Sequence, residues 1–245
     1  MSKSGDLFFG RRFSKIPFCQ YSSVYKKVLI KKSRELSYMN CLIDSVLYIL
    51  ILYFIFSFTE YTVHKYFMHS SYKTFISDGH WNHHKHVLDD MNLKQSDLYN
   101  SNENKFLGLY FVWSYSVIVF LVGLAEGLIL RVLLNYIGIS ISIFWVFVWV
   151  LFFSIYQSSF WNTVHPDIHG IREPLEWSEG IPGSSFWVLL FSSFIIDREK
   201  GVTLYDWFKS NHTMHHLRKG VTKGNYNVTL PGADWILGTM YTSVK

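Results

Sequence analysis

Three long apolar stretches alternate with polar regions along the chain. Residues 41–58 contain a single acid near their start, and residues 106–124 and 132–161 carry no charged side chain. Each stretch approaches the roughly 20 residues that a helix needs to cross a lipid bilayer. We therefore predict three transmembrane helices, with a connection at residues 126–138 between the second and the third.

The remaining residues are polar and divide the chain further. The first 40 residues hold nine Lys or Arg against two acids, so residues 1–37 are predicted to form a basic, mobile leader that anionic lipid could hold. Residues 38–245 are predicted to form one membrane-bound domain. Residues 89–104 and 170–185 are rich in Asn, Asp, Ser, Gly and Pro, which predicts loops.

Ten of the eleven histidines fall into four groups at the ends of these apolar stretches. The groups are His64 and His69 (HKYFMH), His80, His83 and His84 (HWNHH), His165 and His169 (HPDIH), and His212, His215 and His216 (HTMHH). Imidazole is the commonest protein ligand for transition metals, and ten imidazoles exceed what one ion can bind. The pattern predicts a histidine-only site for two metal ions at one membrane face.

Helical periodicity determines how each group presents its rings. Residues at i, i+3 and i+4 share one face of an α-helix, so each HxxHH motif projects three rings together and HPDIH projects two. The five-residue spacing of His64 and His69 turns the second ring by about 140°. These two either bind different ions or lie on a locally distorted turn. His86 points away from the HxxHH face and is left out of the ligand set.

The number of predicted crossings allows all four groups to meet in one compartment. Two crossings separate the second group from the third, and no span separates the first from the second. Between the third and fourth groups lies a shorter apolar stretch, residues 186–196. This stretch is too short to span, so it lies in the interface, re-enters the membrane partway or packs over the metal site.

The distribution of basic residues favours cytosolic histidines. Residues 162–245 contain eight Lys or Arg, and the connection between the second and third spans contains one, Arg131. The positive-inside tendency then places the histidines and the C-terminus in the cytosol. A basic leader one crossing away conflicts with this. The first span is therefore re-entrant, a further pass lies near residues 16–30, or the leader breaks the rule.

The four motifs resemble those of the fatty acid hydroxylase/sterol desaturase superfamily of membrane di-iron oxygenases. Their spacing, HxxxxH, HxxHH, HxxxH and HxxHH, is most similar to that of the fatty acid 2-hydroxylases. Glu60-Tyr61, Asp234-Trp235 and Gly238-Thr239 also resemble that superfamily. The resemblance covers residues 40–240. It implies an all-α integral membrane protein, with a transmembrane helical stem and a histidine-rich dimetal cap at one membrane face, and it implies all ten grouped histidines as ligands.

The resemblance also implies an activity. This is the oxygen-dependent hydroxylation of a fatty acyl chain or a sterol-like lipid by two iron ions, with zinc possible in the purified protein. Cleavage of an unactivated C–H bond requires a strong oxidant, which two redox-active metals can produce from O2. No cytochrome b5 domain of the kind fused to several fatty acid 2-hydroxylases is present in the sequence. Electrons are therefore expected from an external donor such as cytochrome b5 in trans, at the endoplasmic reticulum or an equivalent membrane, with no nucleic-acid partner.

Carboxylates commonly orient ligating imidazoles through the second ring nitrogen. The candidates for this role are Glu60, Asp78, Asp167, Asp197 and Asp206. Each fits equally well as a solvated loop acid or a helix cap. The candidates for lining a lipid channel are Trp81, Trp161, Trp177 and Trp207, and anchoring in the membrane interface is the alternative for each.

Three other functions stay open at this point. A desaturase of the same superfamily begins with the same hydrogen abstraction as a hydroxylase. A non-enzymatic membrane zinc-binding or transport protein is expected to carry histidines and acids within its spans, whereas these histidines lie at the span ends. A pseudo-enzyme would keep the metal site for stability or for partner binding.

Overall fold

The computed structural model describes residues 31, 42–72, 75–92, 109–171, 175–217 and 223–242. The chain divides into two compact units, Met1–Asp44 and Ser45–Lys245. The site below belongs to the second unit, and so does the fold apart from residues 42–44 at the start of the first long helix. Apart from Lys31, the predicted leader lies outside the described residues.

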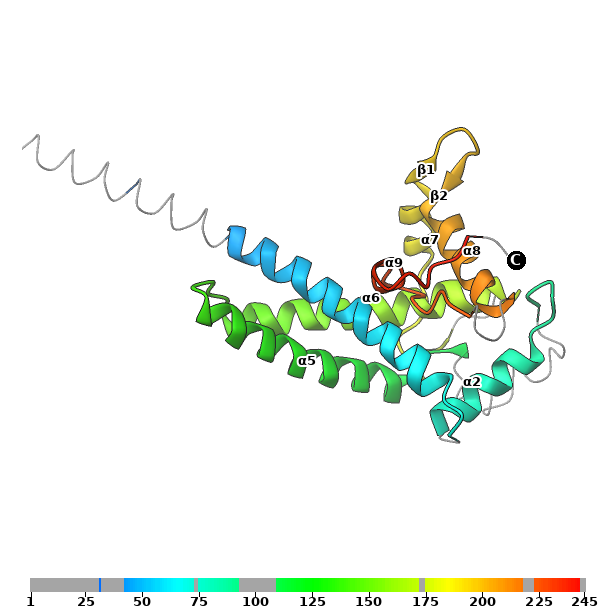
Figure 1. Ribbon diagram of the computed structural model, residues 1–245, viewed down its shortest axis with the longest axis horizontal. Helices are drawn as coiled ribbons and strands as arrows, with labels where there is room; N and C mark the ends of the chain where they lie inside the picture. The colour runs from blue at the N-terminus through cyan, green and yellow to red at the C-terminus, as the bar shows by residue number, and fades with distance from the viewer. Residues whose placement is uncertain are drawn as a thin grey trace, which may run out of the picture. The chain divides into compact units, whose positions relative to one another are not determined.

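Three long helices pack side by side and form the stem (Figure 1). They are Leu42–Met68, here called the first span, α5 (Trp113–Tyr136) and α6 (Ile143–Ile168). Each is long and apolar enough to cross a membrane. The prediction of three apolar helices of membrane-spanning length is therefore confirmed.

The connection between α5 and α6 is shorter than predicted. It occupies residues 137–142 and not 126–138, because α5 continues past two charged residues. Glu126 accepts a hydrogen bond from the hydroxyl of Thr59 in the first span. Arg131 donates from Nε to a main-chain carbonyl in the connection at 2.8 Å. A membrane helix tolerates charged residues that have partners inside the protein, so neither residue ends α5.

The third long helix also differs from the prediction. The third apolar stretch ends at residue 161, but α6 continues through Pro166 to Ile168. Proline lacks the N–H that an interior helix position donates, and here it stands only two residues from the helix end. The missing bond therefore affects only the last turn. His165 and the residue that caps the helix, His169, stay on one helical turn.

Two glycines bring the three stem helices close together. A Cβ at Gly123 would lie 2.3 Å from the Phe56 ring. A Cβ at Gly127 would lie 2.9 Å from both the Tyr48 hydroxyl oxygen and a Val150 methyl. Small residues four positions apart let membrane helices approach closely. The first span and α6 can pack against α5 at this level because neither glycine has a side chain.

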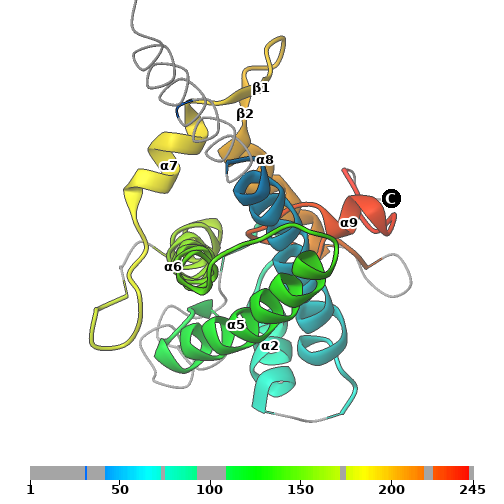
Figure 2. The same cartoon turned by 90° about the vertical axis from the view of Figure 1, so that its left-hand side faces the viewer.

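Shorter elements gather at one end of the stem and form the cap (Figures 1 and 2). They are α2 (Phe75–His86), α7 (Ser185–Ser192), α8 (Leu204–Leu217), α9 (Ala233–Ile236) and an antiparallel hairpin of β1 (Ile195–Asp197) and β2 (Val202–Thr203). Both views place α2 on the opposite side of the cap from α7 and the hairpin. Within the described residues the hairpin is the departure from the expected all-helical fold.

The short apolar stretch at residues 186–196 forms most of α7 and the start of the hairpin. Its Phe191 ring lies 5.2 Å from the Phe160 ring of α6 and 5.6 Å from the Phe208 ring of α8, measured between centroids. The stretch thus packs against α8, which carries three of the grouped histidines, and its placement in the membrane interface, partway into the membrane or over the metal site stays a prediction. The stretch stabilises the helix that positions those rings.

Candidate metal centre

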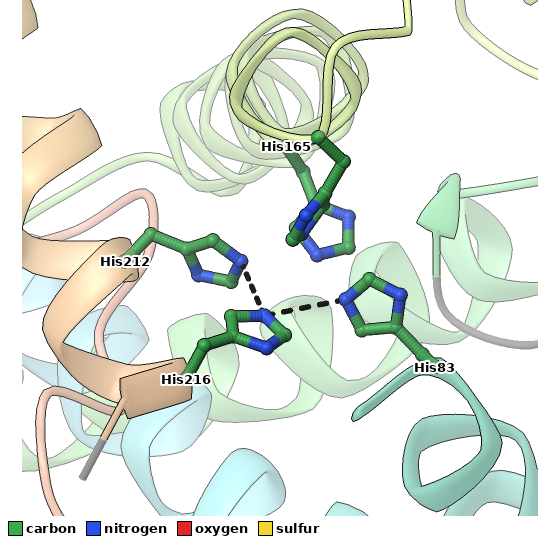
Figure 3. A group of neighbouring side chains, drawn as sticks. His83, His165, His212 and His216 are labelled. Carbon is green, nitrogen blue, oxygen red and sulfur yellow. Dashed lines mark hydrogen bonds between the residues drawn. The ribbon is translucent and has the colours of Figure 1, made fainter. Parts of the chain in front are cut away.

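The ten predicted ligands converge where the stem meets the cap. Nine of them form two groups, and within each group one ring nitrogen per residue lies within 4.8 Å of the others. The five-histidine group is His83, His165, His169, His212 and His216, and the four-histidine group is His64, His69, His80 and His215. Figure 3 shows rings of the five-histidine group pointing toward one another from α2, α6 and α8.

Both HxxHH motifs are shared between the two groups. Helix α2 contributes His80 to the four-histidine group and His83 to the five-histidine group. Helix α8 contributes His215 to the former and His212 and His216 to the latter. The rings of one motif share a helix face, as predicted, but neighbouring rings on that face belong to different groups. Each of these helices therefore links the two groups and holds them next to each other.

The first motif lies on a π-helical turn, η1 (Val63–Met68). The N–H of His69 donates to the carbonyl of His64 at 3.1 Å, which is the i to i−5 bond of a π-helix. The two rings are stacked with centroids 5.3 Å apart. Of the two predicted alternatives, the distorted turn is the one observed, and both rings belong to the same group.

Main-chain carbonyls orient four of the rings. The Nδ1 contacts are His64 to Tyr226 O at 2.6 Å, His165 to Leu109 O at 2.7 Å, His169 to Met91 O at 2.8 Å and His215 to Gly224 O at 2.9 Å. A carbonyl can only accept, so Nδ1 carries the hydrogen in each ring and donates it. In a neutral ring Nε2 then presents a lone pair, which is the arrangement that metal ligation requires.

The Nε2 atoms face one another at short distances. The Nε2–Nε2 distances are 3.2 Å for His64–His80, 3.0 Å for His69–His80, 3.0 Å for His69–His215, 3.3 Å for His83–His216 and 3.0 Å for His212–His216. Nε2 of His165 and of His169 is buried with no hydrogen-bond partner among the described residues. Two imidazoles on one ion, each bound at 2.0–2.1 Å, place their nitrogens about 3–3.4 Å apart. The donor set and its spacing fit two transition-metal ions.

Burial keeps these rings neutral. For the grouped histidines outside the long helices, removal from water, helped by neighbouring rings, lowers the pKa below its ordinary value of 6.5; these are His69, His80, His83, His84, His212, His215 and His216. Burial lowers the pKa of His169 to about 4. A protonated imidazole cannot bind a metal, so a lowered pKa favours ligation at neutral pH.

The tenth predicted ligand, His84, lies between the two groups. Its Nε2 is 3.0 Å from Nε2 of His80 and 3.2 Å from Nε2 of His215. Its ring centroid is 4.1 Å from that of His216. His84 is thus placed to add a fifth ring to the four-histidine group while it packs on the other group. His86 belongs to neither group and contacts the carbonyl of Asn82 through Nδ1 at 2.7 Å.

Glu60 supports the site through the terminal segment, residues 223–242. Its carboxylate accepts hydrogen bonds from the N–H groups of Val228 at 3.2 Å, Thr229 at 2.9 Å and Leu230 at 2.9 Å. The same segment carries the carbonyls that orient His64 and His215. The hydrogen bonds observed for Glu60 therefore run to the terminal segment and not to a ring, and Glu60 acts on the rings through this segment.

The hydrogen bonds observed for the other predicted carboxylate partners do not reach the rings. Asp206 accepts from the N–H and hydroxyl of Thr203 at the start of α8. Asp197 accepts from two N–H groups of the hairpin turn. Asp167 accepts from the Tyr205 hydroxyl at 3.0 Å and pairs with the ammonium of a lysine in α8. Asp78 is exposed. Local turn geometry satisfies Asp197 and Asp206, Asp167 links α6 to α8, and main-chain carbonyls take the orienting role.

Asn162 supports the five-histidine group and was missed from the sequence. Its side-chain oxygen accepts from Phe111 N at 2.6 Å, and its amide donates to Phe111 O at 3.0 Å and to Ile181 O at 2.7 Å. These bonds hold the extended residues just after Leu109, whose carbonyl orients His165. An amide side chain directly after the third apolar stretch and three residues before His165 was the signal that could have identified it.

An apolar cavity of about 110 Å³ lies between the first span, α5 and α6 and reaches the four-histidine group at His64. Among the predicted tryptophans, Trp161 lines this cavity, and its ring lies 4.6 Å from that of His165. Trp81 packs against the His69 ring, Trp177 is exposed, and Trp207 packs on Trp235.

No protein-family model, no curated protein and no solved structure matches this chain.

Proposed function

We propose that this protein is an oxygen-dependent membrane lipid hydroxylase. Each histidine group would hold one iron ion, and His84 would complete the four-histidine group. The observation that carries the proposal is the convergence of two histidine groups at the end of an apolar cavity that lies between three helices of membrane-spanning length. The spacing of the four motifs, which resembles that of the fatty acid hydroxylase/sterol desaturase superfamily, supports the same conclusion.

The chain's own residues account for binding, orientation and the exclusion of water. Carbonyls such as those of Leu109 and Tyr226 fix ring orientation before any ion binds. Burial of the rings removes water from the site. The bound iron pair would supply the reduction of O2 that cleavage of an unactivated C–H bond needs.

The cavity, with Trp161 and His64 at its metal end, would bring one segment of a fatty acyl chain or a sterol-like lipid beside the four-histidine group. Electrons would come from a separate donor of the cytochrome b5 type. The protein would lie in the endoplasmic reticulum or an equivalent membrane. Its cap would face the cytosol, because residues 162–245 carry eight Lys or Arg and residues 126–142, at the other end of the stem, carry one.

Lipid mass spectrometry of cells that express the protein tests this function. The wild type is compared with His215→Ala/His216→Ala, which removes one ring from each group, and with His86→Ala as the matched control. We expect a lipid heavier by one oxygen in the wild type and the control, and its absence in the double variant. A lipid lighter by two hydrogens would assign a desaturase instead.

Identical lipids in all three samples, with the protein found in the membrane and the electron donor supplied, would contradict an enzymatic role. A zinc-binding protein or a pseudo-enzyme would then be the function to test.

A further inference from the structure

One carboxyl group lies within the membrane-length part of α5. Glu126 follows the start of that helix by more than three turns and precedes its end by almost three. Its Oε1 accepts the hydrogen bond from Thr59, and its Oε2 is buried with no hydrogen-bond partner among the described residues. An acid in a membrane span is costly unless it has partners, and such residues commonly mark functional sites.

Glu126 lines the same cavity that reaches His64. Helix α5 contributes one face to this cavity, from Tyr115 to Glu126, which corresponds to roughly 16 Å along the helix axis. Ile118 and Val122 line it and are 47% and 42% exposed. The cavity therefore opens sideways, between the first span and α5, toward the surface that would face lipid.

The position of the carboxyl relative to the histidines follows from its partner. Thr59 precedes His64 by five residues, which places the Glu126 carboxyl roughly 7–8 Å along the helix axis from the level of that ring. The other acid that lines the cavity, Glu60, accepts hydrogen bonds with both oxygens from the terminal segment. Among the described acids that line the cavity, Glu126 is the one with a carboxyl oxygen, Oε2, that has no hydrogen-bond partner.

We infer that Glu126 binds a hydrogen-bond-donating group, a hydroxyl or an amide N–H, on the lipid chain that enters this cavity. A buried acceptor without a partner is unfavourable, and a donor on the ligand satisfies it. The remaining walls are apolar apart from a few side chains, so this contact would determine how far the chain enters. The carbon placed beside the histidines would then be set by its distance from the donor group. This inference rests on the proposed function for the identity of the cavity as the substrate site.

Photo-crosslinking of the full-length protein in lipid nanodiscs tests this contact without turnover. Two probes of equal chain length carry a diazirine at the same carbon, one a hexadecanol and the other a hexadecane. In the wild type we expect the alcohol probe to label peptides of the first span and α5 at least about fivefold more than the alkane probe. Unlabelled hexadecanamide should compete with the alcohol probe if an amide N–H is also accepted.

Three variants separate recognition from folding. Glu126→Leu should remove the preference for the alcohol probe, and Glu126→Gln should keep most of it, because an amide oxygen also accepts. Thr59→Val, at the same level of the cavity, should keep the preference because Oε2 stays open. Equal labelling of the wild type by the two probes would overturn the inference, and so would a preference that Glu126→Leu retains.

The double variant His215→Ala/His216→Ala should lose the lipid product but keep the preference for the alcohol probe, since labelling needs no metal chemistry. A wild type that prefers the alcohol probe but forms no lipid product counts against the proposed function alone. Product formation in a wild type that labels equally with both probes counts against the Glu126 contact alone.

Discussion

The two histidine groups have the same donor chemistry but different supports. In the five-histidine group, four rings come from α6 and α8, and the orienting carbonyls belong to Met91 and Leu109. In the four-histidine group, two rings lie on a π turn, and the orienting carbonyls belong to Gly224 and Tyr226 of the terminal segment. The five-histidine group takes most of its rings from two regular helices, whereas the four-histidine group has two rings on a π turn and both of its orienting carbonyls on one segment. The second should therefore be the easier to disrupt.

Removal of one ring from each group gives the largest expected difference. His80 lies in the middle of the four-histidine group, with Nε2 within 3.2 Å of three other Nε2 atoms. We expect His80→Ala to reduce bound metal from about two ions to about one. Nε2 of His169 has no hydrogen-bond partner among the described residues, so His169→Ala disturbs its neighbours less and should keep both ions, with affinity weakened about 10–100-fold. Elemental analysis after dialysis measures both, and equal metal loss in the two variants would contradict the comparison.

Removal of the carboxylate that holds the terminal segment should disrupt the four-histidine group selectively. In Glu60→Ala the N–H groups of Val228, Thr229 and Leu230 lose their acceptor in a buried setting. We expect a loss of about 3–5 kcal/mol in the free energy of unfolding and a Tm lower by roughly 10 °C.

The ion in the four-histidine group should also leave first when a chelator is titrated into Glu60→Ala. Glu60→Gln, which keeps one acceptor oxygen, serves as the control and should show a smaller effect. Simultaneous loss of both ions would show that the terminal segment does not support one group alone.

A decrease in pH should weaken both groups in the metal-free protein. Burial lowers the pKa of His169 from 6.5 to about 4, so between these values the unfolded chain binds a proton that the folded chain does not. The stabilisation is fully present above about pH 6.5 and is lost as the pH falls, by about 3 kcal/mol from this residue near pH 4. Thermal unfolding at a series of pH values measures this, and a constant Tm between pH 7.5 and 5 would contradict it.

Asn162 supports the five-histidine group as Glu60 supports the four-histidine group. Asn162→Ala removes the side-chain bonds to Phe111 and frees the carbonyl that orients His165. We expect metal affinity of the five-histidine group to fall about tenfold while the four-histidine group is unchanged. Competition with a chromophoric chelator resolves the two affinities. Asn162→Asp keeps an acceptor for Phe111 N and should retain part of the affinity.

The smallest effects should come from the two histidines of this region that belong to neither group, His84 and His86. His84→Ala removes the ring between the groups and should weaken the four-histidine group about tenfold. His86→Ala should change neither affinity, because its ring contacts the carbonyl of Asn82 and lies outside both groups. The same chelator competition compares them, and a larger effect of His86→Ala would mean that the ligand set is wrong.

Local sequence was sufficient to predict part of this protein's structure. Apolar composition predicted three long helices, and helical spacing predicted which histidines share a face and that His86 does not join them. The five-residue spacing of His64 and His69 also restricted that turn to two choices, one of which is observed. These features could be predicted because hydropathy and periodicity depend on residues that are close together along the chain.

Tertiary structure alone decided how the rings divide between the groups and what orients them. A main-chain carbonyl exists at every residue, so nothing in the sequence singles out Leu109 or Tyr226 as a partner of a histidine. Whether a charged residue ends a membrane helix depends on what faces it. Glu126 continues α5 because Thr59, 67 positions earlier in the chain, donates to it. Contacts between distant segments determined these features, and no local pattern of residues encodes them.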